Sequence, residues 1–234
     1  MKISVLVPAF NEEENIEKTL QGLEKFKADF CAKKNIETQI IVIDDGSRDK
    51  TYEKAVKYGV KALRLEGNRG KGGALREGLK RAEGEIIVFL DADLRESSYE
   101  VCKLVEPVLN READVAIARF RPPAKRGGFG LVKTLAFYGI KIFTGKKIKS
   151  ALSGQRAFAR AVLEDIGRIP DGYSLEVGML IDILKRGYTV KEVDVDMYHD
   201  VSGRDLKGFI HRGRQFFDIL KVLISKIGER KAIA

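Results

Sequence analysis

Strand-like apolar runs alternate with helical patterns through the first half of the chain. The runs Ile3–Val7, Gln39–Ile43, Lys61–Leu65 and Glu85–Leu90 are separated by segments whose apolar residues have helical spacing. Strands that alternate with helices of about 10–15 residues favour βαβ units and a parallel sheet. Because crossovers are right-handed, we expect the carboxyl ends of these strands at one edge. The sequence therefore predicts an α/β fold with a mostly parallel central sheet flanked by helices.

Polar motifs follow three of these runs, so we expect them to share that edge. They are Pro8-Ala9-Phe10-Asn11, Asp44-Asp45-Gly46-Ser47 and Asp91-Ala92-Asp93. Ligands of open α/β sheets bind outside the carboxyl ends of the strands. Two carboxylates carried there by a buried strand favour a divalent cation, Mg²⁺ or Mn²⁺, and a phosphorylated ligand. An Asp-x-Asp turn taken alone is more often a solvated loop, so its meaning depends on the other motifs.

A glycine-rich segment opens the helix expected at Lys71–Ala82. Its residues are Asn68-Arg69-Gly70-Lys71-Gly72-Gly73. Glycine lets a backbone approach a ligand closely, and Arg69 and Lys71 can meet a phosphate at the N-terminus of a helix. The segment has neither the spacing of a P-loop nor the position of a dinucleotide fingerprint, so by itself it indicates only an anion site.

The order of the four motifs resembles family 2 of the nucleotide-sugar glycosyltransferases. The matching segments are Pro8–Glu13, Asp44–Asp49, Gly70–Ala74 and Asp91–Asp93. The resemblance implies the GT-A fold, a Rossmann-like α/β arrangement, in a single domain that spans residues 1–234. The parts of that domain would be a nucleotide-sugar half (1–95), an acceptor half (96–206) and a C-terminal amphipathic helix (207–234).

The resemblance also implies roles for individual residues. The donor-binding residues would be Pro8, Phe10, Glu12, Asp44, Asp45, Lys71 and Asp91. Asp93, with Asp91, would hold Mg²⁺ or Mn²⁺ on the diphosphate, and Asp93 would in this way act in catalysis. A cation held by carboxylates offsets the negative charge that builds up on a departing nucleoside diphosphate.

Two segments of the second half narrow the subfamily. Ser153-Gly154-Gln155-Arg156-Ala157 resembles a segment of polyprenyl-phosphate sugar transferases, whereas Gly172–Asp182 is similar to glucosyl-3-phosphoglycerate synthases. The second resemblance implies that Tyr173 and Glu176 contact the donor sugar and that His199 completes the metal site. The metal ligands would then be Asp93, His199 and Asp91.

We therefore predict an enzyme that moves a hexose from a nucleoside diphosphate sugar to a phosphorylated acceptor such as 3-phosphoglycerate. UDP-glucose is the donor implied by resemblance alone. A hydroxyl acceptor with inversion would need a general base, for which Glu176 and Asp182 are candidates. The predicted catalytic residues are Glu176 and Asp93. The alternatives are a polyprenyl-phosphate sugar transferase at the membrane surface, a nucleotidyltransferase and a non-catalytic binding protein.

The positive charge is concentrated in one interval. The chain has a net charge of +9, and the stretch between Asp114 and Glu164 holds eleven basic residues and no acid. An ordinary solvated basic face and a site for a phosphate-bearing acceptor both fit this pattern. The acceptor-binding residues we predict are Arg126, Gly127, Gly128, Arg156, Ser202 and Arg204.

The remaining patterns concern location and partners. Cys31 and Cys102 fit no metal or redox spacing, which favours a reducing, cytoplasmic setting, and we expect neither a signal peptide nor a membrane span. The amphipathic stretches Phe129–Phe143 and Lys207–Ile227 favour packing on the core, with peripheral contact at the inner face of an anionic membrane as the alternative. We expect no nucleic-acid partner, because the sequence has no nucleic-acid-binding motif. The sequence is compatible with a homodimer.

Overall fold

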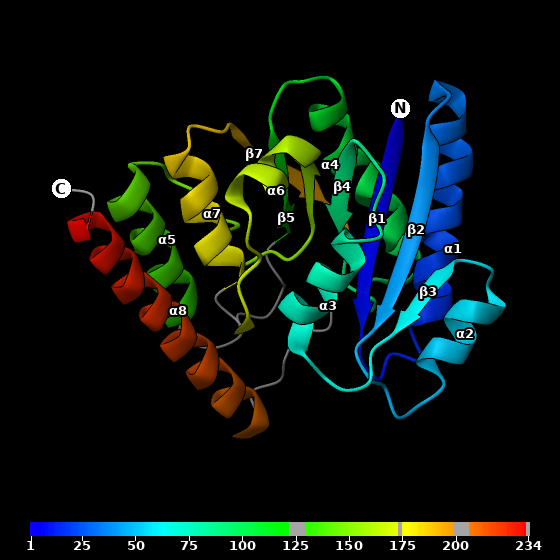
Figure 1. The fold of residues 1–234 in the computed structure, drawn as a ribbon, viewed down its shortest axis with the longest axis horizontal. Coiled ribbons are helices and arrows are strands. Elements are labelled where there is room, and N and C mark those ends of the chain that lie inside the picture. Colours follow the sequence, from blue (N-terminus) through cyan, green and yellow to red (C-terminus); the bar gives the residue numbers. More distant parts are fainter. Residues whose placement is uncertain (122–129, 173–174, 199–205, 233–234) are drawn as a thin grey trace.

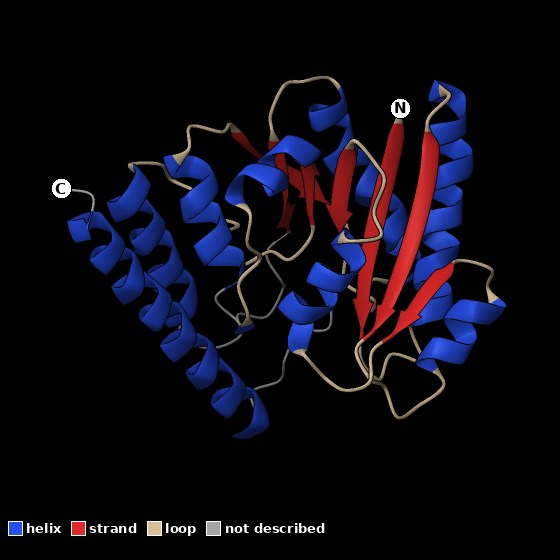
Figure 2. Ribbon diagram, in the orientation of Figure 1, coloured by secondary structure: helices blue, strands red, loops and turns tan. Residues whose placement is uncertain are grey.

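The computed structural model describes residues 1–121, 130–172, 175–198 and 206–232 of the 234-residue chain. Within these residues a seven-stranded sheet runs through the molecule, with helices on both of its faces (Figure 1, Figure 2). The strands lie in the order β3-β2-β1-β4-β6-β5-β7. Their bounds are β1 (Lys2–Ala9), β2 (Glu37–Asp44), β3 (Lys61–Arg64), β4 (Ile86–Phe89), β5 (Val115–Phe120), β6 (Arg156–Ala159) and β7 (Val190–Val195).

One strand of the sheet runs against the others. β1 pairs in parallel with β2 and β4, β2 pairs in parallel with β3, and β5 pairs in parallel with β7. β6 is antiparallel to both of its neighbours, β4 and β5. The predicted mostly parallel α/β sheet is confirmed, but β6 itself was not predicted. Four residues are too few to show a periodic pattern, and its pairing partners are distant in the sequence.

The helices lie close to the predicted helical segments, except that α6 was not predicted. Their bounds are α1 (Ile16–Phe26), α2 (Thr51–Lys57), α3 (Gly70–Leu79), α4 (Val101–Leu109), α5 (Leu131–Thr144), α6 (Arg160–Ile166), α7 (Leu175–Lys185) and α8 (Leu206–Ala232). Three short helical segments of other types complete the described elements. They are the π-helix η1 (Lys27–Cys31) and the 3₁₀ helices η2 (Ala32–Lys34) and η3 (Arg95–Glu100).

The start of α1 differs from the prediction for a structural reason. The apolar spacing predicts a helix from Glu12, but α1 begins four residues later. The backbone N–H groups of residues 11–13 donate to the side chains of Ser47 and Asp49, in the loop after β2, and of Thr51, the first residue of α2. These tertiary hydrogen bonds hold the segment outside the helix and against that loop.

Apolar clusters pack against both faces of the sheet. Ile3, Val5 and Val7 of β1 face the cluster that includes α1 and α4, whereas Leu6 faces the cluster that includes α3, α6 and α7. Alternate residues of a strand point to opposite faces, so a strand covered on both sides is apolar throughout. This double cover fixes the sheet and leaves the loops at its carboxyl edge to carry the polar motifs.

An outer layer of helices lies on the side of the sheet covered by α7. α5 and α8 pack against each other and against α7 (Figure 1). None of the described helices is both long enough and apolar enough to cross a membrane. The sheet continues across the predicted division at residues 95 and 96, because β4 pairs with β6.

Candidate functional site

The carboxyl ends of β1 and β2 are tied together by reciprocal hydrogen bonds. The Asn11 N–H group donates to Ser47 Oγ at 2.8 Å, and the Arg48 N–H group donates to Asn11 Oδ1 at 2.9 Å. Asn11 has a φ of +56°, in the left-handed region that asparagine tolerates better than most residues. The first two sequence motifs therefore form one structural unit at the edge of the sheet.

Asp44 and Asp45 stand at the end of β2, and both are buried. Asp44 Oδ1 accepts a hydrogen bond from the Ser47 N–H group at 3.1 Å. Asp44 Oδ2 lies 3.4 Å from Arg64 Nε, but it accepts no hydrogen bond from the described residues. An acid with one unmatched oxygen at this edge is compatible with the donor-binding role predicted for Asp44.

Asp45 connects the second motif to the third. Its Oδ1 accepts the backbone N–H group of Arg69 at 2.8 Å, directly before α3 begins. Burial raises the pKa of Asp45, although the backbone N–H groups of Arg69 and Gly70 oppose the shift. Asp45 therefore fixes the glycine-rich segment against the end of β2.

Lys71 lies in the first turn of α3 and reaches two carboxylates from other elements. Its Nζ is 2.5 Å from Asp91 Oδ1 and 3.6 Å from Glu176 Oε1. Burial by itself lowers the pKa of Lys71, but the two carboxylates outweigh burial and the pKa is raised. The fold thus brings three of the predicted site residues into one cluster, with a charged ammonium group between the end of β4 and α7.

A residue that the sequence did not single out holds the other side of Asp91. Gln155 Nε2 donates to Asp91 Oδ2 at 2.6 Å, and the Gln155 side chain is buried. Gln155 directly precedes β6, and the antiparallel pairing of β6 with β4 places it beside the end of β4. The sequence motif Ser153–Ala157 includes Gln155, but only the unpredicted pairing of β6 with β4 places this residue at Asp91.

Arg156 does not fit the acceptor-binding role predicted for it. Its side chain is 2% exposed and donates to the carbonyl oxygens of Ala151, Ser153 and Glu176 at 2.8, 2.9 and 3.0 Å. Burial lowers the pKa of Arg156 to about 10, while Glu176 opposes that shift. Arg156 therefore braces the loop before β6 against the first turn of α7, and this burial argues against the acceptor-binding role, which stays a prediction.

Asp91 and Asp93 flank Ala92 in the turn after β4, and both are half-buried. Within the described ranges, no three His, Cys, Asp or Glu side chains converge as a group that could hold a metal. Carboxylate oxygens suit Mg²⁺, which usually takes one or two carboxylates and completes its coordination with phosphate oxygens and water. The donor set therefore fits the predicted cation in company with a phosphorylated ligand.

Other predicted donor residues line the same edge. Pro8 lies near the end of β1, and Phe10 follows that strand with 43% of its surface exposed. Glu12 Oε2 accepts a hydrogen bond from Asn15 Nδ2 at 2.9 Å. The remaining predicted site residues lie outside the described residues: Tyr173, His199, Arg126, Gly127, Gly128, Ser202 and Arg204.

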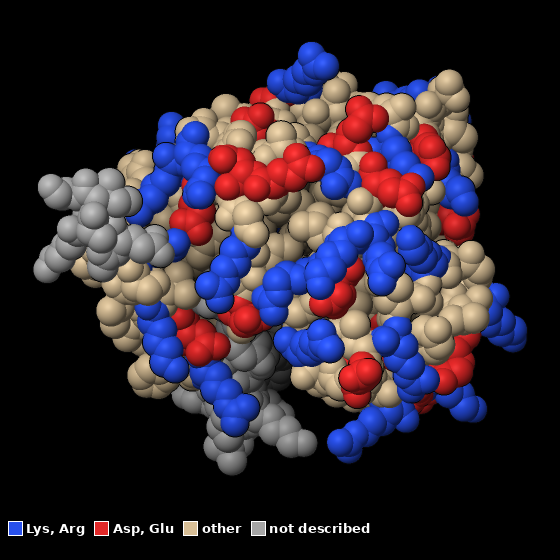
Figure 3. Space-filling model, in the orientation of Figure 1, with Lys and Arg blue, Asp and Glu red and all other residues tan. Residues whose placement is uncertain are grey.

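Part of the basic interval is paired within the sheet. Arg119 Nε lies 2.5 Å from Asp194 Oδ1, and Arg121 Nε lies 2.7 Å from Asp196 Oδ1. On the face drawn in Figure 3, Lys and Arg are interspersed with Asp and Glu rather than gathered in one patch. For these two arginines the pairing favours an ordinary solvated face over an acceptor site.

Comparison with known proteins agrees with this arrangement. The family model described as "Glycosyl transferase family 2" matches residues 4–167, which contain all four motifs of the first half. The chain belongs to glycosyl transferase family 2. An uncharacterized protein of Methanocaldococcus jannaschii is 38% identical over 204 residues, which cover 83% of this chain and 80% of that protein.

A second relative has a named activity. The dolichol-phosphate mannosyltransferase of Pyrococcus furiosus is 30% identical over 233 residues, or 94% of this chain. The matched region spans 62% of that enzyme's length.

Solved structures of glucosyl-3-phosphoglycerate synthase from Mycobacterium tuberculosis have a similar fold. The complex with Mn²⁺, UDP and glucosyl-3-phosphoglycerate has a TM-score of 0.78 and 26% identity, and the match covers 97% of this chain and 80% of that one. Another structure of that synthase contains Mg²⁺ and UDP. The predicted Mg²⁺ or Mn²⁺ agrees with the metals in these complexes.

The family assignment decides between the predicted classes. The protein is a glycosyltransferase with a GT-A fold, as the sequence predicted. The nucleotidyltransferase and the non-catalytic binding protein are therefore set aside. The names of these relatives include both a phosphoglycerate and a dolichol phosphate.

Proposed function

We propose that the protein transfers a hexose from a nucleoside diphosphate sugar to a phosphorylated acceptor, with 3-phosphoglycerate as the first candidate. The observation that carries this proposal is the cluster of Lys71, Asp91 and Glu176 at the carboxyl edge of the sheet. Each residue comes from a different motif, and the cluster places a cation and two acids where α/β proteins bind their ligands.

The donor diphosphate would meet positive charge at the start of α3. Lys71 carries its ammonium there, and the N-terminus of a helix attracts anions. Asp93 and Asp91 would hold Mg²⁺ or Mn²⁺, which when bound stabilises the negative charge on the departing diphosphate. The ion pair of Lys71 with Asp91 keeps the local charge balanced before the ligand arrives.

Glu176 is the better of the two carboxylates proposed to face the sugar. Its side chain is 13% exposed and lies beside Lys71, at the start of α7. Asp182 instead lies 2.6 Å from Lys226 of α8, so it is engaged in the packing of α7 against α8. Tyr173 and His199 are proposed to complete the donor and metal sites, on the strength of the sequence resemblance.

A small phosphorylated acid is supported as acceptor by the match to glucosyl-3-phosphoglycerate synthase across 97% of the chain. The test is transfer from UDP- and GDP-sugars, with Mg²⁺ or Mn²⁺, to 3-phosphoglycerate in the absence of lipid. Formation of a glycosylated phosphoglycerate is the expected result. Failure of UDP and GDP to bind in a metal-dependent way by calorimetry would refute the proposed donor site.

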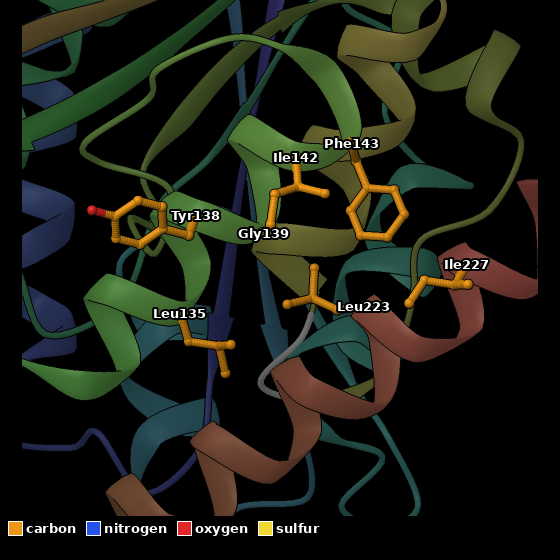
Figure 4. Close-up of a pocket in the computed structure, with 7 residues that line it drawn as sticks. All are labelled: Leu135, Tyr138, Gly139, Ile142, Phe143, Leu223 and Ile227. Atoms are coloured by element: carbon orange, nitrogen blue, oxygen red, sulfur yellow. The ribbon is translucent and has the colours of Figure 1, made fainter.

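A polyprenyl phosphate is the second candidate, because α5 and α8 leave a groove of apolar side chains at the surface. The groove has a volume of about 270 Å³, and Figure 4 shows side chains of both helices around it. They are Leu135, Tyr138, Gly139, Ile142, Phe143, Leu223 and Ile227. Lys133, Lys141 and Lys221 are exposed on the same two helices. Apolar surface accompanied by lysines suits an anionic membrane, where a lipid-phosphate acceptor would reside.

The two acceptors can be separated by one further measurement. Transfer is followed to a polyprenyl phosphate in vesicles with and without anionic lipid, beside the lipid-free reaction with 3-phosphoglycerate. Product only from the vesicles would select the lipid acceptor and a peripheral membrane location, whereas product from 3-phosphoglycerate alone would select the soluble acceptor. A cytoplasmic location and a homodimer stay predictions in either case.

A further inference from the structure

We infer that Gly154 and Gln155 are positioning residues, which fix the ion pair of Lys71 with Asp91 and so shape the site for the donor diphosphate. The inference rests on the proposed transfer from a nucleoside diphosphate sugar. It gives the antiparallel strand β6 a role at the site, because both residues lie in the loop that leads into this strand.

Gln155 is held so that its amide nitrogen faces Asp91. Its Nε2 donates to Asp91 Oδ2 at 2.6 Å, and its Oε1 accepts a hydrogen bond from the Ser153 hydroxyl at 3.2 Å. The backbone carbonyl of Gln155 accepts the Ala118 N–H group of β5 at 3.0 Å. With its backbone and both ends of its amide engaged, this buried side chain fixes Asp91 in one orientation.

Gly154 supplies the space that the ammonium of Lys71 occupies. A Cβ atom at position 154 would lie 2.2 Å from Lys71 Nζ and 3.2 Å from Asp91 Oδ2. Any larger residue would therefore collide with the ion pair. The colliding atom is the far end of a flexible side chain, so the collision would displace the ammonium rather than the backbone.

Together the two residues act on the same pair from different sides. Gln155 binds one oxygen of Asp91, which leaves the other oxygen directed at Lys71, 2.5 Å away. Gly154 leaves the ammonium free to reach that oxygen. Loss of either residue should loosen Lys71 while the buried contacts of Arg156, the next residue, remain in place.

The first test measures the reactivity of the Lys71 amine and needs no ligand. Reductive methylation followed by mass spectrometry gives the labelling rate of Lys71 relative to the exposed Lys141. The Lys71 side chain is 29% exposed and its amine is held by Asp91, so we expect slow labelling in the wild type. In Gly154→Ala and Gln155→Leu the rate should rise several-fold. Unchanged labelling in both variants would overturn the inference.

The second test asks whether the loosened pair affects the diphosphate in particular. Calorimetry compares UDP with UMP, and GDP with GMP, for the wild type and both variants. We expect the diphosphate to bind about tenfold more weakly, the effect of one lost hydrogen bond to a charged group, and the monophosphate to be little affected. Equal weakening of both nucleotides would indicate a general structural defect and contradict the positioning role.

Matched variants control for the substitutions themselves. Gly213→Ala adds a methyl group in α8, where nothing lies within 4 Å of the new Cβ, and Gln39→Leu removes an amide at β2, outside the site. Neither should change the labelling of Lys71 or the preference for diphosphates. If the wild type binds no nucleotide, the proposed function fails, and the labelling rates still decide whether Gly154 and Gln155 position the ion pair.

Discussion

The loops that follow β1, β2 and β4 form the carboxyl edge of the sheet, here called the donor edge. This edge and the outer layer of α5 and α8 are built by opposite means. At the edge, polar side chains are paired with polar partners, as Asp45 is with the Arg69 N–H group and Asp91 is with Lys71 and Gln155. In the outer layer, apolar side chains stay at the surface, and Ile142 is 69% exposed.

The difference teaches how each region can recognise a ligand. Matched polar groups hold fixed geometry, which suits a diphosphate with defined oxygen positions. Exposed apolar surface has no directional demand, which suits a lipid surface. From this contrast we expect substitutions at the edge to alter catalysis or folding, and substitutions in the outer layer to alter only association with a membrane.

The largest expected effect comes from Lys71→Met. The variant removes the cation that faces Asp91 and Glu176, and we expect sugar transfer to fall by about 10²–10³-fold, as for loss of one preorganised charge-stabilising donor. The measurement is kcat/KM for the sugar donor at a saturating concentration of acceptor. Lys80→Met, at the exposed position directly after α3, is the control and should keep its activity. Full activity in Lys71→Met would remove the edge cluster from the mechanism.

Arg156→Met tests how much the stability of the protein depends on the hydrogen bonds that hold the loop before β6 against α7. The substitution takes the donors away from three carbonyl oxygens, so we expect the free energy of unfolding to fall by about 3 kcal/mol. Urea unfolding followed by circular dichroism measures it. Arg81→Met, at an exposed position, should change the free energy of unfolding by less than about 0.5 kcal/mol. A similarly small change in Arg156→Met would return this arginine to the candidates for acceptor binding.

The sequence predicted the motifs at the donor edge, but it did not predict β6 or the position of Gln155 at that edge. The motifs after β1, β2 and β4 follow strands with clear apolar runs, and right-handed crossovers bring them to one edge. Gln155 could not be placed, because β6 is short and pairs antiparallel with a strand far away in the chain. For the same reason the charge of Arg156 indicated a ligand, whereas its burial shows a structural role.

The outer layer shows a second limit of sequence reasoning. The amphipathic pattern of α5 predicted a helix that packs on the core, and Ala136 and Ile140 are indeed buried. The pattern did not show that Ile142 and Tyr138 would stay exposed, because exposure depends on how α8 crosses α5. Tertiary packing decides which apolar residues of such a helix remain at the surface.

Ile142→Glu tests the outer layer at the most exposed isoleucine among its described side chains. We expect binding to anionic vesicles to weaken by about tenfold, because an apolar contact is replaced by a charge that the lipid repels. Vesicle co-sedimentation measures it, with transfer to 3-phosphoglycerate as a check that the donor site is intact. Val56→Glu, at an exposed apolar position of α2, should bind vesicles as the wild type does. Equal binding by Ile142→Glu would mean that this layer does not serve as a membrane surface.

The smallest expected effect separates two acids within the donor edge itself. Burial raises the pKa of Asp45 in the folded protein. The free energy of unfolding therefore falls as the pH rises from the ordinary Asp pKa through this raised pKa. Burial acts in the same direction on Asp49, but hydrogen bonds from Thr51 and from the Glu13 N–H group outweigh it and the pKa is lowered. Asp49 therefore stabilises the folded protein at pH values above the ordinary Asp pKa. This stability is lost as the pH falls through the lowered pKa of Asp49.

Asn substitutions at the two positions should consequently change stability in opposite directions with pH. Relative to the wild type, Asp45→Asn should gain stability as the pH rises from the ordinary Asp pKa through the raised pKa of Asp45. Asp49→Asn should lose stability, relative to the wild type, as the pH rises from the lowered pKa of Asp49 through the ordinary Asp pKa. Urea unfolding between about pH 2.5 and pH 7 measures both differences, and subtraction of the wild-type curve removes the contribution of the other acids. Parallel curves for the two variants would show that the matched polar groups of the donor edge do not set these ionisations.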